Sequence, residues 1–170
     1  ANFVSIIVTQ YQEHVNSTDI FPVYGEAIPC FATPHGFCIT ATDKEINDTI
    51  TYAKGLGLGV MLKLQIDLIS EPADSGLWRG FIGVNMTDPE WDLWFESYTR
   101  VLLHYAEISE ALGVELFTVS TELVTASAKE HHWRKLIKKV RKVYSGRLTD
   151  AANWSPTPWG SGEVTDKKWW

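Results

Sequence analysis

Polar and ionisable side chains stand at the ends of several apolar segments of this sequence. They are Gln10 and Tyr11 after FVSIIVT, Gln65 and Asp67 in LKLQIDL, Thr121 and Glu122 after ELFTVS, and Asn153 and Trp154 after LTDAA. Parallel strands bring their carboxyl ends to one edge of a sheet, so side chains at such positions would converge on a single mouth. The sequence therefore predicts one polar mouth, with Glu122 as its candidate general acid and the neighbouring residues as candidate substrate contacts.

Glu122 is the most informative of these residues, because a strand buried on both faces normally ends without a charge. An apolar strand and the wall of neighbouring strands around the carboxyl group would favour its protonated form, which a general acid needs. The alternative is that Glu122 caps the following helix or pairs with a lysine. The sequence leaves both interpretations open.

Aromatic residues make up 12% of the chain, with eight Trp, six Tyr and seven Phe. Several tryptophans stand beside glycine, proline or polar residues, a distribution that fits surfaces on which sugar rings stack. Trp78 and Trp154 lie in loop-like sequence and could face a ligand. Trp91, Trp94 and Trp133 fall in helical patterns, which favours a place in the core.

The composition is that of one globular domain, and we treat residues 1–170 as a single domain. The 170 residues are 45% hydrophobic and carry a formal net charge of −6, with a pI near 5.3. This acidic balance argues against nucleic acid or anionic lipid as a partner. No apolar run reaches the roughly 18 residues that span a bilayer, and no secretory leader is visible at the N-terminus.

Two patterns nevertheless predict an extracellular or secreted protein. Cys30 and Cys38 enclose seven residues that include Pro34 and Gly36, so this loop could close a disulfide. Two unpaired thiols are the alternative. N-x-S/T sequons begin at four of the five asparagines: Asn16, Asn47, Asn85 and Asn153. We expect glycosylation at the first three, since Asn153 also follows a predicted strand.

Apolar runs and helical periods alternate along the chain. Strands are predicted at residues 3–9, 59–66, 115–120 and 148–152, and the first has the near-continuous apolar pattern of a strand covered on both faces. Helices are predicted after the T-x-x-E capping boxes at Thr42 and Thr87, and again at 128–144. The third helix is rich in lysine and arginine, which fits a solvated face better than an anion site.

Such alternation predicts parallel strands, in either a doubly wound sheet or a (β/α)₈ barrel. The connections from helix to strand are short, whereas those from strand to helix are long: residues 10–41 and 67–86 have no period. Long loops at the carboxyl ends of strands are typical of the barrel. The chain is shorter than the roughly 250 residues of a full barrel, so the sequence predicts a partial one, α/β with about four parallel strands and three intervening helices.

Several segments, in their order and spacing, match a known family. They are VTQYQEHVNST, LGVMLKLQIDL, WRG at 78–80, WFESYTRVLLHYAEISEALGVELFTVSTEL, WRKLIKKVRKVYSGRLT and AANW. Together they resemble the TIM-barrel proteins of glycoside hydrolase family 113, a group that contains β-mannanases within the large clan of retaining glycosidases. The resemblance covers nearly the whole chain, from about the second strand of the barrel to the fifth.

The resemblance implies a double displacement by two carboxyl groups roughly 5 Å apart, with Glu122 as the acid/base. It places the nucleophile on a seventh strand outside these residues, so we expect the isolated chain to be inactive on oligo- or polysaccharides. The rest of the barrel would come from the same precursor, another chain or self-association, against the strand edges at 3–9 and 148–152. No cofactor and no metal is implied.

The sequence departs from the family pattern at three places. Gln10 stands where we expect Trp, Leu64 and Gln65 stand where we expect Pro-His, and Thr121 stands where many clan members have Asn. Gln10 and Gln65 favour the alternative of a non-catalytic, secreted carbohydrate-binding or structural relative. The retained Glu122, Asn153 and Trp154 favour the hydrolase. An acyl hydrolase is excluded by the lack of a G-x-S-x-G elbow, and a dinucleotide fold by the position of LGLGV before a strand.

Overall fold

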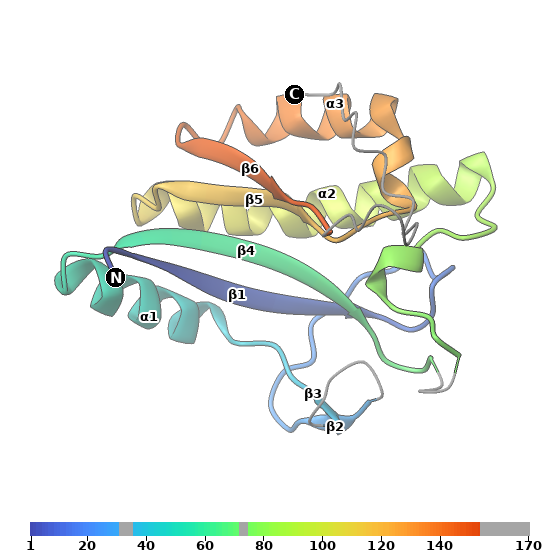
Figure 1. Ribbon diagram of the computed structural model, residues 1–170, viewed down its shortest axis with the longest axis horizontal. Coiled ribbons are helices and arrows are strands. Elements are labelled where there is room, and N and C mark those ends of the chain that lie inside the picture. The colour runs from blue at the N-terminus through green and yellow to red at the C-terminus, as the bar shows by residue number, and fades with distance from the viewer. Residues whose placement is uncertain (31–35, 72–74, 154–170) are drawn as a thin grey trace.

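A parallel four-stranded sheet forms the centre of the molecule (Figure 1). The computed structural model describes residues 1–30, 36–71 and 75–153. The sheet has the order β1-β4-β5-β6, and its strands are β1 (Phe3–Gln12), β4 (Gly59–Leu68), β5 (Leu116–Thr121) and β6 (Arg147–Ala151). All four predicted strands are confirmed, and β1 and β4 extend further toward their carboxyl ends than expected.

Three α-helices connect these strands: α1 (Asp43–Gly55), α2 (Asp88–Ala111) and α3 (Glu130–Val140). Both predicted capping boxes are present, formed by Thr42 with Glu45 and by Thr87 with Glu90. Each threonine hydroxyl and each glutamate satisfies a backbone N–H that the helix start would otherwise leave unbonded. The third helix is shorter than predicted at both ends, since a 3₁₀ turn at Ala126–Ala128 precedes it and it ends at Val140.

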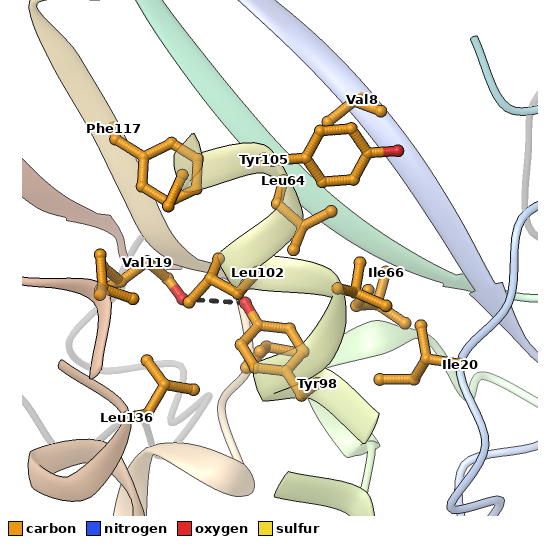
Figure 2. Close-up of a cluster of buried hydrophobic side chains, with 14 of the residues drawn as sticks. Val8, Ile20, Leu64, Ile66, Tyr98, Leu102, Tyr105, Phe117, Val119 and Leu136 are labelled. Atoms are coloured by element: carbon orange, nitrogen blue, oxygen red, sulfur yellow. Dashed lines mark hydrogen bonds between the residues drawn. The ribbon is translucent and has the colours of Figure 1, made fainter. Parts of the chain in front are cut away.

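One face of the sheet packs against all three helices and forms the core. Figure 2 shows the part of this core between the sheet and α2. On β4 the alternate residues Val60, Leu62, Leu64 and Ile66 are at most 1% exposed. From α2, the hydroxyl of Tyr98 donates to the carbonyl of Val119 on β5 at 2.9 Å, and burial raises the pKa of this tyrosine. The helices are therefore fixed to the sheet by apolar contact and by a buried hydrogen bond.

The opposite face of the sheet is open in the described part of the chain. Phe3 and Ile7 on β1 are 42% and 51% exposed, and Met61 and Lys63 on β4 are half-buried. The second face of residues 3–9 is therefore not covered by the described residues. The apolar pattern fits a strand of a complete barrel, which faces helices on one side and the other barrel strands on the other.

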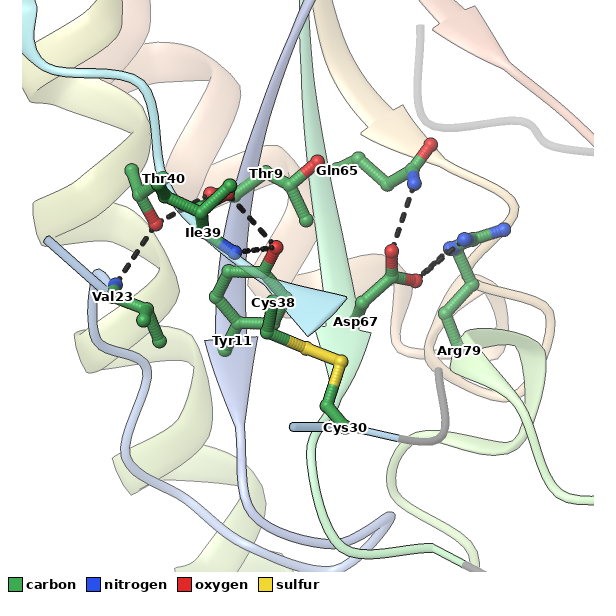
Figure 3. Close-up of a disulfide and its surroundings, with 10 residues drawn as sticks. All are labelled: Thr9, Tyr11, Val23, Cys30, Cys38, Ile39, Thr40, Gln65, Asp67 and Arg79. Carbon is green, nitrogen blue, oxygen red and sulfur yellow. Dashed lines mark hydrogen bonds and ion pairs between the residues drawn. A yellow bond between two sulfur atoms is a disulfide. The ribbon is translucent and has the colours of Figure 1, made fainter. Parts of the chain in front are cut away.

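A small hairpin covers the carboxyl end of β1 (Figure 3). It consists of β2 (Ile28–Pro29) and β3 (Phe37–Cys38), and a disulfide joins Cys30 to Cys38 with the Cα atoms 5.7 Å apart. The predicted disulfide is thus confirmed. β1 and β6 are the two edge strands, as expected. Among the described helices, none is long and apolar enough to cross a membrane.

Candidate active site

Hydrogen bonds tie together the carboxyl ends of β4, β5 and β6. The hydroxyl of Thr121 donates to the carbonyl of Leu64 at 2.7 Å, and the N–H of Glu122 donates to the carbonyl of Ala151 at 2.9 Å. Glu122 therefore starts from a backbone position that both neighbouring strands hold in place.

The backbone of Glu122 is itself unusual. Its φ of 54° lies in the left-handed region, which a non-glycine residue enters at a cost of about 1–3 kcal/mol. Such conformations persist where the surrounding structure enforces them, and they cluster at functional sites. At Glu122 the chain therefore leaves the extended path of β5 (Leu116–Thr121).

Arg79 joins Glu122 to Asp67. The Nε and Nη2 atoms of Arg79 donate to Oδ1 of Asp67 at 2.8 and 2.5 Å, and its Nη1 donates to Oε2 of Glu122 at 2.6 Å. Arg79 belongs to the 3₁₀ turn η1 (Arg79–Phe81), which lies between β4 and α2. Three segments that are distant in the sequence thus meet in one charged cluster.

Burial differs across this cluster. The side chain of Asp67 is 6% exposed, that of Arg79 is 18% exposed, and that of Glu122 is 32% exposed. The apolar surroundings expected for Glu122 are therefore wrong, because a guanidinium group contacts its carboxyl directly. Of the two carboxyl groups, Glu122 is the one that a ligand can reach, and Asp67 is the one that anchors the arginine.

Gln65 also belongs to this group. Its Nε2 donates to Oδ2 of Asp67 at 3.0 Å, so each oxygen of the buried carboxylate has a hydrogen-bond donor (Figure 3). Gln65 and Asp67 lie on the open face of β4, opposite the apolar face that packs on the helices. The structure thus brings together Gln65, Asp67 and Glu122, as the sequence predicts.

Gln10 does not join this group. It is 3% exposed, and its Nε2 donates to the hydroxyl of Tyr105 on α2 at 2.7 Å. Because Gln10 has the parity of Val4, Ile6 and Val8, its side chain faces the helix layer and not the open face. The expectation that Gln10 converges on the mouth is therefore wrong, since the strand runs past the position at which it was expected to end.

Tyr11 lies on the open face, but the backbone that follows β3 binds its hydroxyl. Its hydroxyl donates to the carbonyl of Ile39 and accepts from the N–H of the same residue, both at 3.0 Å. Its ring packs in a small cluster with Val23 and the disulfide. Burial raises the pKa of Tyr11, so its hydroxyl stays neutral and able to donate. The arrangement favours a structural role for Tyr11 over the predicted substrate contact.

We expect Tyr11→Phe to lower the free energy of unfolding by about 1 kcal/mol, because the polar groups of Ile39 lose their partner. The KM for an oligosaccharide substrate of the complete protein is expected to stay unchanged. Urea denaturation and steady-state kinetics measure the two effects. A raised KM with unchanged stability would instead return Tyr11 to the substrate contacts.

Of the remaining predicted contacts, the structure describes Trp78 and Asn153. Trp78 is half-buried and packs on its own turn, with its ring edge-to-face on Phe81 at a centroid distance of 6.3 Å. Asn153 follows β6 and is 8% exposed. Trp154 lies outside the described residues. Trp91, Trp94 and Trp133 are all at most 2% exposed, which confirms their predicted place in the core.

Arg79 is the residue that sequence reasoning missed. The WRG segment counts toward the family resemblance, but no period or motif assigns a role to its arginine. A signal exists in the composition of the loop at 67–86, where Arg79 is the one arginine or lysine. A lone cation in the loop that follows the strand segment before Asp67 is a candidate partner for that carboxylate.

The predicted glycosylation sites differ in access. Asn16 and Asn85 are exposed, and both lie outside the helices and strands, whereas Asn47 lies half-buried within α1. No group of three or more His, Cys, Asp or Glu residues that could hold a metal occurs in the described segments.

Comparison with known proteins places this chain in a family. The family model of glycoside hydrolase family 113 matches residues 1–170. A family 113 β-1,4-mannanase solved as a complex is 34% identical with a TM-score of 0.70, over 88% of this chain and 44% of its own. The β-mannanase of Alicyclobacillus acidocaldarius in complex with ManMIm is 32% identical with a TM-score of 0.68, over 88% and 43%.

No curated protein matches the chain. The chain spans less than half the length of the solved mannanases that it matches, so its four parallel strands and three helices form a partial (β/α) barrel. The chain belongs to glycoside hydrolase family 113.

Proposed function

We propose that the complete protein hydrolyses a β-linked mannan by a retaining mechanism, with Glu122 as the acid/base. The observation that carries this proposal is the Glu122 carboxyl group, which is accessible at the carboxyl end of β5, held in a strained backbone conformation and contacted by Arg79. Family membership and the likeness to β-1,4-mannanases support the choice of substrate.

In the first step Glu122 would donate its proton to the glycosidic oxygen as the bond to the anomeric carbon breaks. A second carboxylate would form the covalent bond to that carbon. In the second step the ionised Glu122 would take a proton from water, whose oxygen displaces the enzyme carboxylate. We place the second carboxylate on a barrel strand outside these 170 residues, since Asp67 is buried against Arg79 and cannot reach a sugar.

The complete protein is expected to release the new reducing end with its β configuration, which proton NMR of early products from a mannan oligosaccharide would detect. The second candidate is a carbohydrate-binding relative without activity. It is favoured by Gln65, whose amide is bound to Asp67 instead of standing free toward a sugar. Binding of the oligosaccharide in calorimetry without any turnover would support that candidate, and initial release of the α anomer would contradict a retaining mechanism.

We also propose that the protein is secreted and glycosylated at Asn16 and Asn85. The disulfide of Cys30 with Cys38 and the exposure of these two asparagines support this. The half-buried Asn47, within α1, is the least accessible of the three predicted acceptors.

A further inference from the structure

The charged cluster of Asp67, Arg79 and Glu122 contains an arginine to which the proposed acid/base mechanism gives no role. We infer that Arg79 is a positioning residue that holds the carboxyl group of Glu122 in its working orientation, and that Asp67 acts only through Arg79, as the anchor of its guanidinium. This inference rests on the proposed function of Glu122.

The geometry of the guanidinium divides its donors between two tasks. Two nitrogens of Arg79 bind one oxygen of Asp67, which leaves Nη1 to bind Glu122 at 2.6 Å. Asp67 is buried and its other oxygen is bound by Gln65, so it is fixed on both sides. A planar guanidinium held at one edge by a fixed carboxylate has little freedom, and its free edge therefore sets the position of Glu122.

The backbone around Arg79 is also fixed to the segment that carries Glu122. The N–H and the hydroxyl of Thr125 both donate to the carbonyl of Gly80, each at 3.0 Å. A Cβ atom at Gly80 would lie 2.6 Å from the ring of Trp78, so this close packing requires glycine. The WRG turn is thus built against the loop after β5, and Arg79 reaches Glu122 from a rigid support.

The charges of the cluster suit an acid that must lose and regain a proton. While Glu122 is protonated, Asp67 balances the charge of Arg79. As Glu122 gives its proton to the leaving group, negative charge develops on its carboxyl. The hydrogen bond from the cationic Nη1 then becomes an ion pair and is stronger. An interaction that is stronger in the transition state than in the substrate complex raises kcat, whereas one that is equally strong in both does not.

The test uses the complete protein and two substrates, a mannan oligosaccharide and an aryl β-mannoside with an activated leaving group. Arg79→Ala is expected to lower kcat/KM on the oligosaccharide by about 100-fold, with a much smaller loss on the activated substrate, whose departure needs no proton. Low concentrations of guanidinium chloride should restore part of the oligosaccharide activity. The matched control is Arg134→Ala, because Arg134 is an exposed arginine of α3 that is paired with Glu130. This control should leave kcat/KM unchanged on both substrates.

Arg79→Ala leaves Asp67 buried without its cation, which can unfold the protein. The double variant Arg79→Ala with Asp67→Asn removes that charge and keeps the test usable. Because Asp67 acts through Arg79, the double variant should be no less active than Arg79→Ala alone. Arg79→Lys keeps the charge but not the fork, so an intermediate loss is expected.

Equal losses on both substrates, with no rescue by guanidinium, would overturn the inference, because a merely structural arginine lowers the active fraction and not the ratio between substrates. Full activity of Arg79→Ala would overturn it while leaving the proposed function intact. A wild-type protein that turns over neither substrate would contradict the proposed function and, with it, this inference.

Discussion

Replacing Glu122 with glutamine is expected to lower kcat/KM of the complete protein on a mannan oligosaccharide by roughly 10²–10⁴-fold, the range that general acid catalysis supplies. The amide has no proton of suitable acidity for the glycosidic oxygen. An activated aryl β-mannoside should lose far less in the same quantity, because its leaving group departs unprotonated. Steady-state kinetics on both substrates measures the contrast.

Folding should survive this substitution. The side chain of Glu122 is 32% exposed, and the hydrogen bond to Ala151 uses the backbone N–H of Glu122 and not its carboxyl group. The amide oxygen of glutamine can still accept from Arg79. Glu130→Gln is the matched control, since it removes one partner of an exposed pair with Arg134 on α3, and it should alter neither activity nor stability.

A structural role for Glu122, as a helix cap or ion-pair partner, leads to a different outcome. The thermal midpoint would fall with a stability loss of about 1 kcal/mol, and both substrates would lose the same modest factor. That result would remove Glu122 from the catalytic role.

Replacing Trp94 with alanine is expected to reduce the free energy of unfolding by about 3–5 kcal/mol, among the largest effects of a single substitution. Trp94 is fully buried and stacks on Tyr98 with a centroid distance of 4.9 Å and an interplanar angle of 11°. It also meets Phe95 edge-to-face at 4.9 Å. Removing its ring opens a cavity that the neighbouring aromatic rings cannot fill without moving.

Trp94→Phe separates packing from hydrogen bonding at the same place. The indole Nε1 donates to Oε1 of Gln12, a fully buried side chain, at 2.9 Å. Phenylalanine keeps an aromatic ring but leaves that oxygen without its donor, at a cost of about 1–3 kcal/mol beyond the smaller ring. Leu93→Ala is the control, because Leu93 is the preceding residue of α2 and is 55% exposed. Chemical denaturation should show the largest loss in free energy of unfolding for Trp94→Ala, a smaller loss for Trp94→Phe and the smallest for Leu93→Ala. A loss for Trp94→Ala no larger than that for Leu93→Ala would contradict the packing argument.

The elements of this fold could be predicted because their signals are local. A capping box needs only Thr42 and Glu45, three residues apart, and the apolar face of α2 repeats within each turn. For the two cysteines the sequence left a disulfide and two unpaired thiols as alternatives. The disulfide could be proposed because the two residues are only 8 positions apart in the sequence. Exact bounds were less predictable: β1 continues through Gln12, because hydrogen bonds to β4 extend it beyond its apolar run.

The site was predictable only in part. Glu122 could be found because a charge directly after an apolar strand is visible in the sequence. Gln10 was misplaced because one residue of offset sends a side chain to the other face of a strand, and pairing with β4 decides where that strand ends. Asp67 was expected at the mouth, but nothing in the sequence said that it is buried against a cation.

The sequence by itself determined the alternation of strands and helices along the chain. It also determined that an acidic residue, Glu122, follows the carboxyl end of one strand. These features depend on side chains a few residues apart, whose periods and capping signals act before the chain is compact. Only the tertiary structure decided the partner of Glu122. Arg79 is 12 residues from Asp67 and 43 residues from Glu122. Contacts at such separations depend on how the parallel strands pair and on where an aperiodic loop packs, and no local preference of the chain encodes either.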